Sequence, residues 1–183
     1  MKNKTFNKVL QSDKSNNDLL IKKTLDFFNE NNLKFDNVSK IFVNQGPGNF
    51  SGLRSSIAMA KGLSLSKNIK LFGYNTFIWS CAKFLNEKKD IYSIIKFREK
   101  YYVKNFDNNF SSVSISKEVS KDQIIKNYNN KFLVVPKNMQ SYFDKKILAL
   151  SDMNIADLDH NNLELLQLKG LLDEDLIKPL YLS

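Results

Sequence analysis

One stretch of the chain decides the fold: Gln45-Gly46-Pro47-Gly48-Asn49-Phe50-Ser51-Gly52-Leu53-Arg54. It holds three of the six glycines and one of the three prolines of the 183-residue sequence. Glycine permits positive φ and close backbone approach, whereas proline fixes φ, so the stretch predicts a rigid turn. An apolar run at residues 38–44 precedes it and a helical pattern follows it. We therefore expect a strand, a loop and a helix in that order.

The flanking segments continue this alternation. Apolar residues recur at helical spacing over about residues 20–30 and 53–66, and residues 70–74 form a short apolar run typical of a strand. Asn75 or Thr76 can cap a third helix that reaches about residue 85. A weakly alternating run at residues 4–11 predicts a short edge strand. Helices and strands that alternate in this way predict an α/β layer with parallel strands.

The pattern changes after residue 90. Residues 91–97, 101–106 and 110–116 predict three strands joined by short turns, hence an antiparallel meander. We then expect a helix at 121–128, a strand at 131–136, a helical turn at 138–143, a strand at 146–150 and a helix at 161–172. The polar run 86–90 marks the seam between two subdomains, so we expect domains at 1–88 and 89–183.

The composition narrows the class of protein. No stretch is as long and apolar as a membrane span and the N-terminus lacks the apolar core of a signal peptide, so we expect a cytoplasmic protein without a membrane partner. The 28 basic and 19 acidic residues give a net charge of +9, which is compatible with an RNA partner. The lysines are scattered along the chain, so coding bias toward lysine is an alternative explanation of the positive charge. The basic and aromatic alternation at residues 96–104 favours an exposed hairpin over a nucleic-acid surface.

Two nucleotide motifs fail at the glycine-rich stretch. The P-loop needs four residues between its glycines, but Gly46 and Gly52 are separated by five, and Leu53 and Arg54 follow instead of Lys and Ser or Thr. The dinucleotide fingerprint would need glycine at Ser51. Two interpretations stay open, a tight turn without ligand and an anion site at the N-terminus of the helix. The loop residues concerned are Gly46, Pro47, Gly48, Ser51, Gly52 and Arg54.

The helix after the loop has two distinct faces. Its core face is predicted from the apolar spacing of Leu53, Ile57, Ala60 and Leu63. A second face is made of small residues and one methionine: Ser55, Ala58, Met59 and Gly62. Glycine inside a helix costs roughly 1 kcal/mol relative to alanine, so Gly62 favours close approach by another backbone. That backbone belongs either to this chain's own sheet or first helix, or to a helix of a second protein.

The stretch resembles a known family. Residues 45–54, followed by Ala58-Met59-Ala60-Lys61-Gly62-Leu63, are similar to the signature G-P-G-S-F-T-G-L-R…A-x-A-K-G-L of the TsaB (YeaZ) family. The preceding amphipathic helix and the terminal Pro179-Leu180-Tyr181-Leu182 resemble the family in kind and order. The resemblance implies an actin-like ATPase (RNase H-like) α/β fold with two lobes and mixed sheets.

The same resemblance implies a function without catalysis by this chain. TsaB pairs with the transferase TsaD, and with the ATPase TsaE they install the threonylcarbamoyl group on adenosine 37 of tRNA. TsaD uses a metal held by paired histidines, and a single imidazole, His160, cannot supply such a pair. We expect no catalytic residue, no metal and no cofactor held by this chain alone, with a nucleotide placed at the partner interface. Expected partners are a TsaD-like transferase through Ser55, Ala58, Met59 and Gly62, a TsaE-like ATPase, tRNA through the complex, and a second copy of the chain.

The sequence departs from the family at two places. The family begins with a β-hairpin that faces nucleotide phosphates, and this chain starts near the family's third strand, so the first lobe is expected to be incomplete. The family's D-A-R segment stands here as Lys96-Phe97-Arg98, which keeps only the arginine.

Two other classes of function are open from the residues. A glycoprotease-like peptidase would need a nucleophile beside a base, but Cys81 lies in an apolar run and is expected to be buried and inert. A basic RNA-binding module would use Arg54, Lys61 and residues 96–104 to contact phosphates.

Overall fold

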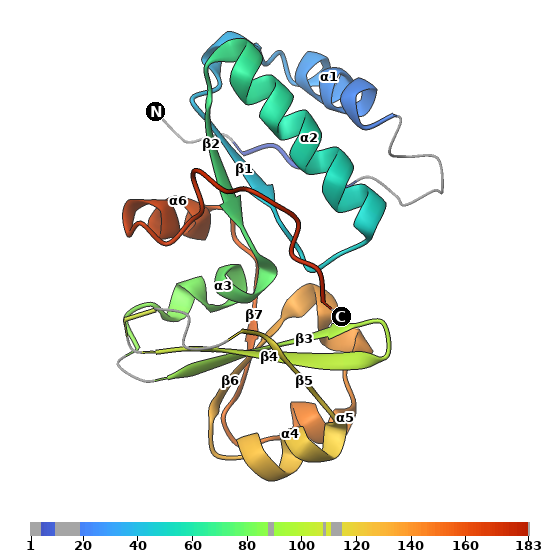
Figure 1. Cartoon of the computed structure of the whole chain (residues 1–183), viewed down its shortest axis with the longest axis vertical. Coiled ribbons are helices and arrows are strands. Elements are labelled where there is room, and N and C mark those ends of the chain that lie inside the picture. The colour runs from blue at the N-terminus through green and yellow to red at the C-terminus, as the bar shows by residue number, and fades with distance from the viewer. Residues whose placement is uncertain (1–4, 10–18, 88–89, 108, 111–114, 183) are drawn as a thin grey trace.

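The structure, a computed structural model, describes residues 5–9, 19–87, 90–107, 109–110 and 115–182 (Figure 1). Its strands form two separate sheets. In the first sheet β1 (Lys40–Asn44) pairs in parallel with β2 (Lys70–Tyr74). The second sheet has five strands in the order β5-β4-β3-β6-β7. Mixed pairing and two lobes agree with the predicted α/β fold.

The first lobe is a parallel β-α-β unit with one further helix. α2 (Phe50–Lys67) connects β1 to β2 and covers one face of their sheet, while α1 (Leu20–Glu30) lies outside α2 (Figure 1). A short 3-10 turn, η1 (Phe35–Asn37), links α1 to β1. Val43 and the α2 residues Ile57 and Ala60 form a small core with Ile177 from the end of the chain. α2 is thus fixed on its inner side and exposed on its outer side.

The second lobe contains the predicted meander. β3 (Ile91–Phe97) pairs antiparallel with β4 (Lys100–Phe106), and β4 pairs antiparallel with β5 (Lys117–Val119). β6 (Phe132–Pro136) and β7 (Met153–Ala156) extend the sheet in parallel from β3. The third strand of the meander begins later than the predicted residues 110–116, of which 111–114 lie outside the described residues.

Helices cover both faces of this second sheet. The face toward the first lobe carries α3 (Thr76–Cys81), η2 (Ala82–Phe84) and α6 (Asn161–Leu168). The opposite face carries α4 (Lys121–Tyr128), η3 (Lys137–Tyr142) and α5 (Lys145–Leu148). Successive residues of a strand point to opposite faces of the sheet. Ile95 is fully buried in the core on the side of α3, and Ile94 is fully buried in the core on the side of α4. No helix in the described part of the chain combines the length and apolarity that crossing a bilayer requires.

The chain returns to the first lobe after α6. Gly73 of β2 and Asp173 exchange both main-chain hydrogen bonds, at 2.8 and 3.0 Å. Lys40 Nζ donates to Gln167 Oε1 at 2.9 Å, which joins α6 to β1. Figure 1 shows the last segment, in red, running alongside α2 to the C-terminus. The end of the sequence is therefore part of the surroundings of α2.

Three local predictions are wrong. Residues 146–150 do not form a strand: Asp144 caps α5 by accepting a 2.8 Å hydrogen bond from Lys146 N–H, and the strand comes later as β7. The last helix ends at Leu168 because Gly170 follows with a φ of +67°, a left-handed conformation typical after a helix. Residues 5–9, the described part of the predicted first strand, are not in a strand.

Candidate functional site

The loop after β1 is tied to the turn that begins α3. Gly46 N–H donates a 2.8 Å hydrogen bond to Asn44 Oδ1, and the carbonyl of Gly46 accepts one of 2.8 Å from Thr76 N–H. Asn44 Nδ2 also donates to Thr76 Oγ1 at 3.1 Å. These bonds use the polar groups where β1 and β2 end. The predicted turn is therefore present, and its hydrogen bonds anchor it to Asn44 of β1 and to Thr76 at the start of α3.

Two glycines of this loop lie close to their neighbours, and at Gly46 a side chain does not fit. Gly46 has a φ of +120°, and a Cβ there would lie 2.9 Å from the carbonyl oxygen of Leu180 and 3.0 Å from Leu53 Cδ1. A Cβ at Gly48 would lie 3.3 Å from Leu53 Cδ2. Pro47 between them is buried. Packing against α2 and the end of the chain thus explains these glycines without a ligand.

α2 begins at a side-chain cap. Asn49 has an extended backbone, and its Oδ1 accepts a 3.0 Å hydrogen bond from Ser51 N–H. Ser51 and Arg54 are exposed here and Gly52 is half-buried. Because the cap already uses one of the free N–H groups of the first turn, its capacity for an anion is reduced. An anion contact at this end stays a prediction.

Arg54 joins the first turn of α2 to the end of the chain. Its Nε donates a 3.1 Å hydrogen bond to Tyr181 Oη, and its guanidinium lies 4.0 Å from the centre of the Phe50 ring. The rings of Phe50 and Tyr181 are stacked with centroids 5.1 Å apart. The three side chains form an exposed aromatic and cationic cluster, which the sequence did not predict because Tyr181 is far from Phe50 and Arg54 in the chain.

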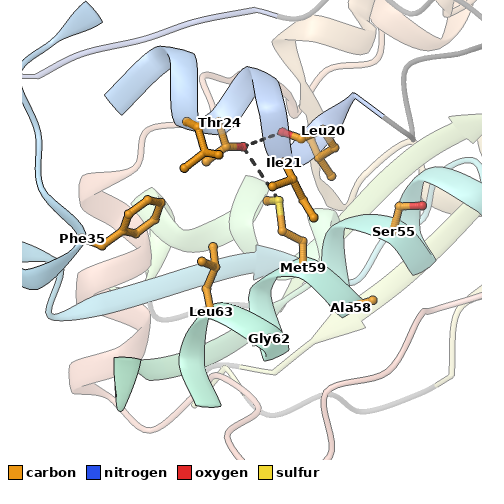
Figure 2. Close-up of a pocket in the computed structure, with 10 residues that line it drawn as sticks. Leu20, Ile21, Thr24, Phe35, Ser55, Ala58, Met59, Gly62 and Leu63 are labelled. Atoms are coloured by element: carbon orange, nitrogen blue, oxygen red, sulfur yellow. Dashed lines mark hydrogen bonds between the residues drawn. The ribbon is translucent and has the colours of Figure 1, made fainter. Parts of the chain in front are cut away.

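A groove of about 450 Å³ lies between α1 and α2 (Figure 2). Thr24 connects the two helices: its Oγ1 donates to the carbonyl of Leu20 at 2.9 Å and contacts Met59 Sδ at 3.8 Å. The lining is mainly apolar and contains no charged residue. Its residues are Leu20, Ile21, Thr24, Leu25, Phe35, Ser55, Ala58, Met59, Gly62 and Leu63. We call this surface the α1–α2 groove.

The small face of α2 predicted for partner binding lines this groove as a unit. Ser55, Ala58, Met59 and Gly62 all border it. Within the described residues, no atom lies within 4 Å of a Cβ built on Gly62, so the close neighbour that this glycine predicts is not in that part of the chain. Leu63, predicted to be in the core, also lines the groove, because α2 rotates it past the edge of the sheet toward α1.

α1 contributes the half of the groove that sequence reasoning did not assign. Every residue of α1 is at least partly exposed; Ile21 is 61% and Leu25 is 45% exposed. Exposed apolar side chains grouped along a groove mark an interaction surface more strongly than the same residues scattered. The signal was the amphipathic spacing of residues 20–28. Periodicity alone does not reveal whether such a face is covered by the chain's own core.

The two residues with catalytic potential lie outside this groove. Cys81 is fully buried, and burial raises the pKa of its thiol to about 12, which confirms the predicted buried position. His160 lies on the surface next to α6, with Nδ1 3.4 Å from Asp159 Oδ1. Among the described residues, no three His, Cys, Asp or Glu side chains gather in a way that could hold a metal ion.

The two sheets with their covering helices define a two-lobed α/β fold. Residues 14–97 match the family model of TsaD, described as a tRNA N6-adenosine threonylcarbamoyltransferase. The matched segment contains α1, the loop and α2, and therefore the whole α1–α2 groove.

Two solved structures from Pseudomonas aeruginosa share the fold over most of their length. YeaZ aligns with a TM-score of 0.60 and 13% identity, over 92% of this chain and 85% of its own. A protein described as uncharacterized, with similarity to the peptidase YEAZ, aligns with a TM-score of 0.59 and 14% identity, over 91% and 83%. No curated protein sequence gives a significant match. The chain therefore has a YeaZ-like fold.

Proposed function

We propose that this chain is a non-catalytic subunit for the synthesis of N6-threonylcarbamoyladenosine in tRNA, and that it binds and supports a TsaD-like transferase. The observation that carries the proposal is the α1–α2 groove, an uncharged and apolar surface inside the segment that matches the TsaD family model. The YeaZ-like fold of the whole chain supports the same assignment.

The groove suits a helix of a partner protein. Apolar side chains of a docking helix can enter between α1 and α2, and the open space above Gly62 lets a second backbone approach closely. Ile21 and Leu25 would lose their exposed area on binding, which favours association through the hydrophobic effect. A second copy of the chain is the competing occupant, because its own α1 and α2 carry the same apolar side chains.

The proposal assigns the chemistry to the partner. Cys81 is sealed in the core with a protonated thiol, and His160 is a surface residue, so neither is positioned as a nucleophile with its base. These positions do not favour a peptidase. We propose that any nucleotide of the complex binds at the partner interface, and that a TsaE-like ATPase and tRNA meet this chain through the assembled complex.

The test is co-purification with a TsaD-like transferase and calorimetric measurement of the Kd. Gly62→Leu fills the space above the helix and should weaken binding by about 100-fold, as loss of a central contact does. Gly62→Ala adds only one methyl group and should weaken the complex much less than Gly62→Leu does. Both variants should stay folded, since a Cβ built on Gly62 meets no described atom within 4 Å beyond its chain neighbours and the backbone of its own helix.

A matched pair of polar substitutions separates the groove from surface hydrophobicity in general. Ile21→Gln changes an exposed apolar residue in the groove, and Leu65→Gln changes an 86% exposed one on α2 that does not line it. Only Ile21→Gln should weaken the complex. Equal binding by Gly62→Leu and the wild type, or equal losses for Ile21→Gln and Leu65→Gln, would rule out this groove as the interface.

A further inference from the structure

α2 borders a second groove, on the side where the end of the chain runs. This groove of about 690 Å³ separates α2 from the C-terminal segment that Figure 1 shows alongside it, and we call it the C-terminal groove. Three cations and an apolar floor line it, together with one aromatic ring: Arg54, Lys61, Lys178, Ile57, Pro179 and Tyr181. Its character is the opposite of the α1–α2 groove, which has no charged lining residue.

The three cations of this groove have no acidic partner among the described residues. No carboxylate lines the groove, and in the part of the chain that the structure describes neither Arg54, Lys61 nor Lys178 forms an ion pair within 4.0 Å. Other lysines are paired, for example Lys67 with Asp36 at 3.2 Å and Lys137 with Asp157 at 3.0 Å. Unpaired cations gathered along one hollow attract a chain of negative charges.

Of two stacked aromatic rings, Tyr181 lines the groove, and Phe50, which is not a lining residue, packs on Tyr181. Phe50 and Tyr181 are 52% and 47% exposed although they are stacked on each other. Arg54 fixes the arrangement through its contact with the Phe50 ring and its hydrogen bond to Tyr181 Oη. Planar rings that are both exposed and held in place are suited to stacking with a nucleobase, which an acidic peptide does not require.

We propose that the C-terminal groove binds single-stranded RNA, with phosphates at Arg54, Lys61 and Lys178 and an unpaired base on the Phe50–Tyr181 stack. The strand must be single because a base inside a duplex does not present its face to an aromatic ring. Ala58 borders both grooves, so the RNA and the protein partner would occupy adjacent sides of one helix. The inference rests on the proposed function only for identifying the RNA as tRNA.

Fluorescence anisotropy with the full chain tests this inference. The probes are a fluorescein-labelled RNA stem-loop with an unpaired loop and a fully paired duplex of the same length. The variant carrying Arg54→Gln, Lys61→Gln and Lys178→Gln should raise the Kd for the stem-loop at least tenfold. It should also reduce the slope of log K against log salt by about 2, as expected for three lost contacts to a single strand.

The control variant carries Lys126→Gln, Lys145→Gln and Lys146→Gln, which alter exposed lysines of the second lobe. It removes the same charge and should keep most of the affinity.

Substitution of Tyr181 tests the stacking half of the inference. Tyr181→Leu should weaken stem-loop binding about tenfold and leave duplex binding unchanged. Tyr181→Phe keeps the ring and should bind the stem-loop as the wild type does. Equal losses in the two triple variants, or equal affinity for duplex and stem-loop, would overturn the inference. So would displacement of the RNA by poly-glutamate at equal charge concentration, which would indicate an acidic protein segment as the occupant.

The result is separable from the proposed function because the same variants can be assayed for binding to the TsaD-like transferase. A complex that forms normally while both triple variants bind RNA alike refutes the RNA groove and leaves the proposed subunit role standing. RNA binding that depends on the groove in a chain that forms no such complex refutes the subunit role alone.

Discussion

The amide of Leu180 donates a 2.6 Å hydrogen bond to the main-chain carbonyl of Gln45, so the end of the chain is fastened to the loop that begins α2. A second bond reinforces it, because Gln45 Nε2 donates to the carbonyl of Lys178 at 3.1 Å. Both proposed binding surfaces depend on this junction. It fixes the start of α2, which borders the α1–α2 groove, and it holds the segment that forms the other wall of the C-terminal groove.

Gly46→Ala should destabilise the protein. The new Cβ would lie 2.9 Å from the Leu180 carbonyl oxygen, and alanine does not readily adopt the φ of +120° found here. We expect the free energy of unfolding in urea to fall by about 2 kcal/mol or more. We also expect faster proteolysis of the C-terminal segment, because its anchor at Gln45 would shift.

Gly62→Ala should have the opposite effect on stability. Gly62 lies inside α2 with nothing within 4 Å of a Cβ, and alanine is the better helix former. The free energy of unfolding should rise by about 0.5–1 kcal/mol. Gly46→Ala and Gly62→Ala are the same chemical change, so a difference between them reports the surroundings of each glycine. Similar changes in both variants would contradict the assignment of Gly46 as a packed, positive-φ position and of Gly62 as an open one.

Local signals were sufficient to predict the loop, α2 and the meander. The glycine and proline spacing of residues 46–52, the apolar period of α2 and the alternation in β3 and β4 are each set within a few neighbours. The error at residues 146–150 is also local. An apolar run of that length fits a strand or a helix, and the capping hydrogen bond of Asp144 decides in favour of the helix.

Contacts between distant parts of the chain were not predictable in the same way. The bond between Gln45 and Lys178 joins residues 133 positions apart, and the stack of Phe50 with Tyr181 also joins the start of α2 to the end of the chain. The sequence around one residue of such a contact does not indicate which distant residue it will meet. The four residues of α2 predicted for partner binding do line one groove. The second wall of this groove, with Ile21 and Leu25, depends on where α1 lies.

Cys81 should resist thiol reagents in the native state. Its side chain is fully buried at the end of α3, and burial raises the pKa of the thiol from 9.0 to about 12, so the reactive thiolate is scarce at pH 8. Reaction with Ellman's reagent should be at least about 1,000-fold slower than in urea, because labelling requires opening of the core. Ser66→Cys in a Cys81→Ala background places a thiol at an exposed position and should react at once. Comparable rates for the two thiols would show that the core around α3 opens freely.

The same raised pKa gives a pH dependence. The unfolded chain loses the thiol proton above about pH 9, whereas the folded protein keeps it to about pH 12. The proton therefore stabilises the native state below pH 9, and this contribution is lost as the pH rises from 9 to 12. Cys81→Ala should show a smaller loss of unfolding free energy than the wild type over this range. An identical pH profile for both proteins would mean that the thiol is solvated in the native state.

Lys104→Met should stabilise the protein at pH 7. Lys104 lies on β4 between the buried Tyr102 and Phe106 and on the same side of the sheet, and desolvation lowers its pKa while Asp173 acts in the opposite direction. Since the pKa is lower in the folded state than in the unfolded state, the unfolded chain binds more protons between the two values. The wild type should therefore gain stability as the pH rises through that window toward 10.5.

Methionine at position 104 carries no charge, so the variant should lack this pH-dependent gain and should be more stable than the wild type at neutral pH by up to about 1 kcal/mol. Lys126→Met, an exposed position, should change the free energy of unfolding by less than about 0.5 kcal/mol. A destabilised Lys104→Met would show that attraction to Asp173 outweighs the desolvation of the ammonium group.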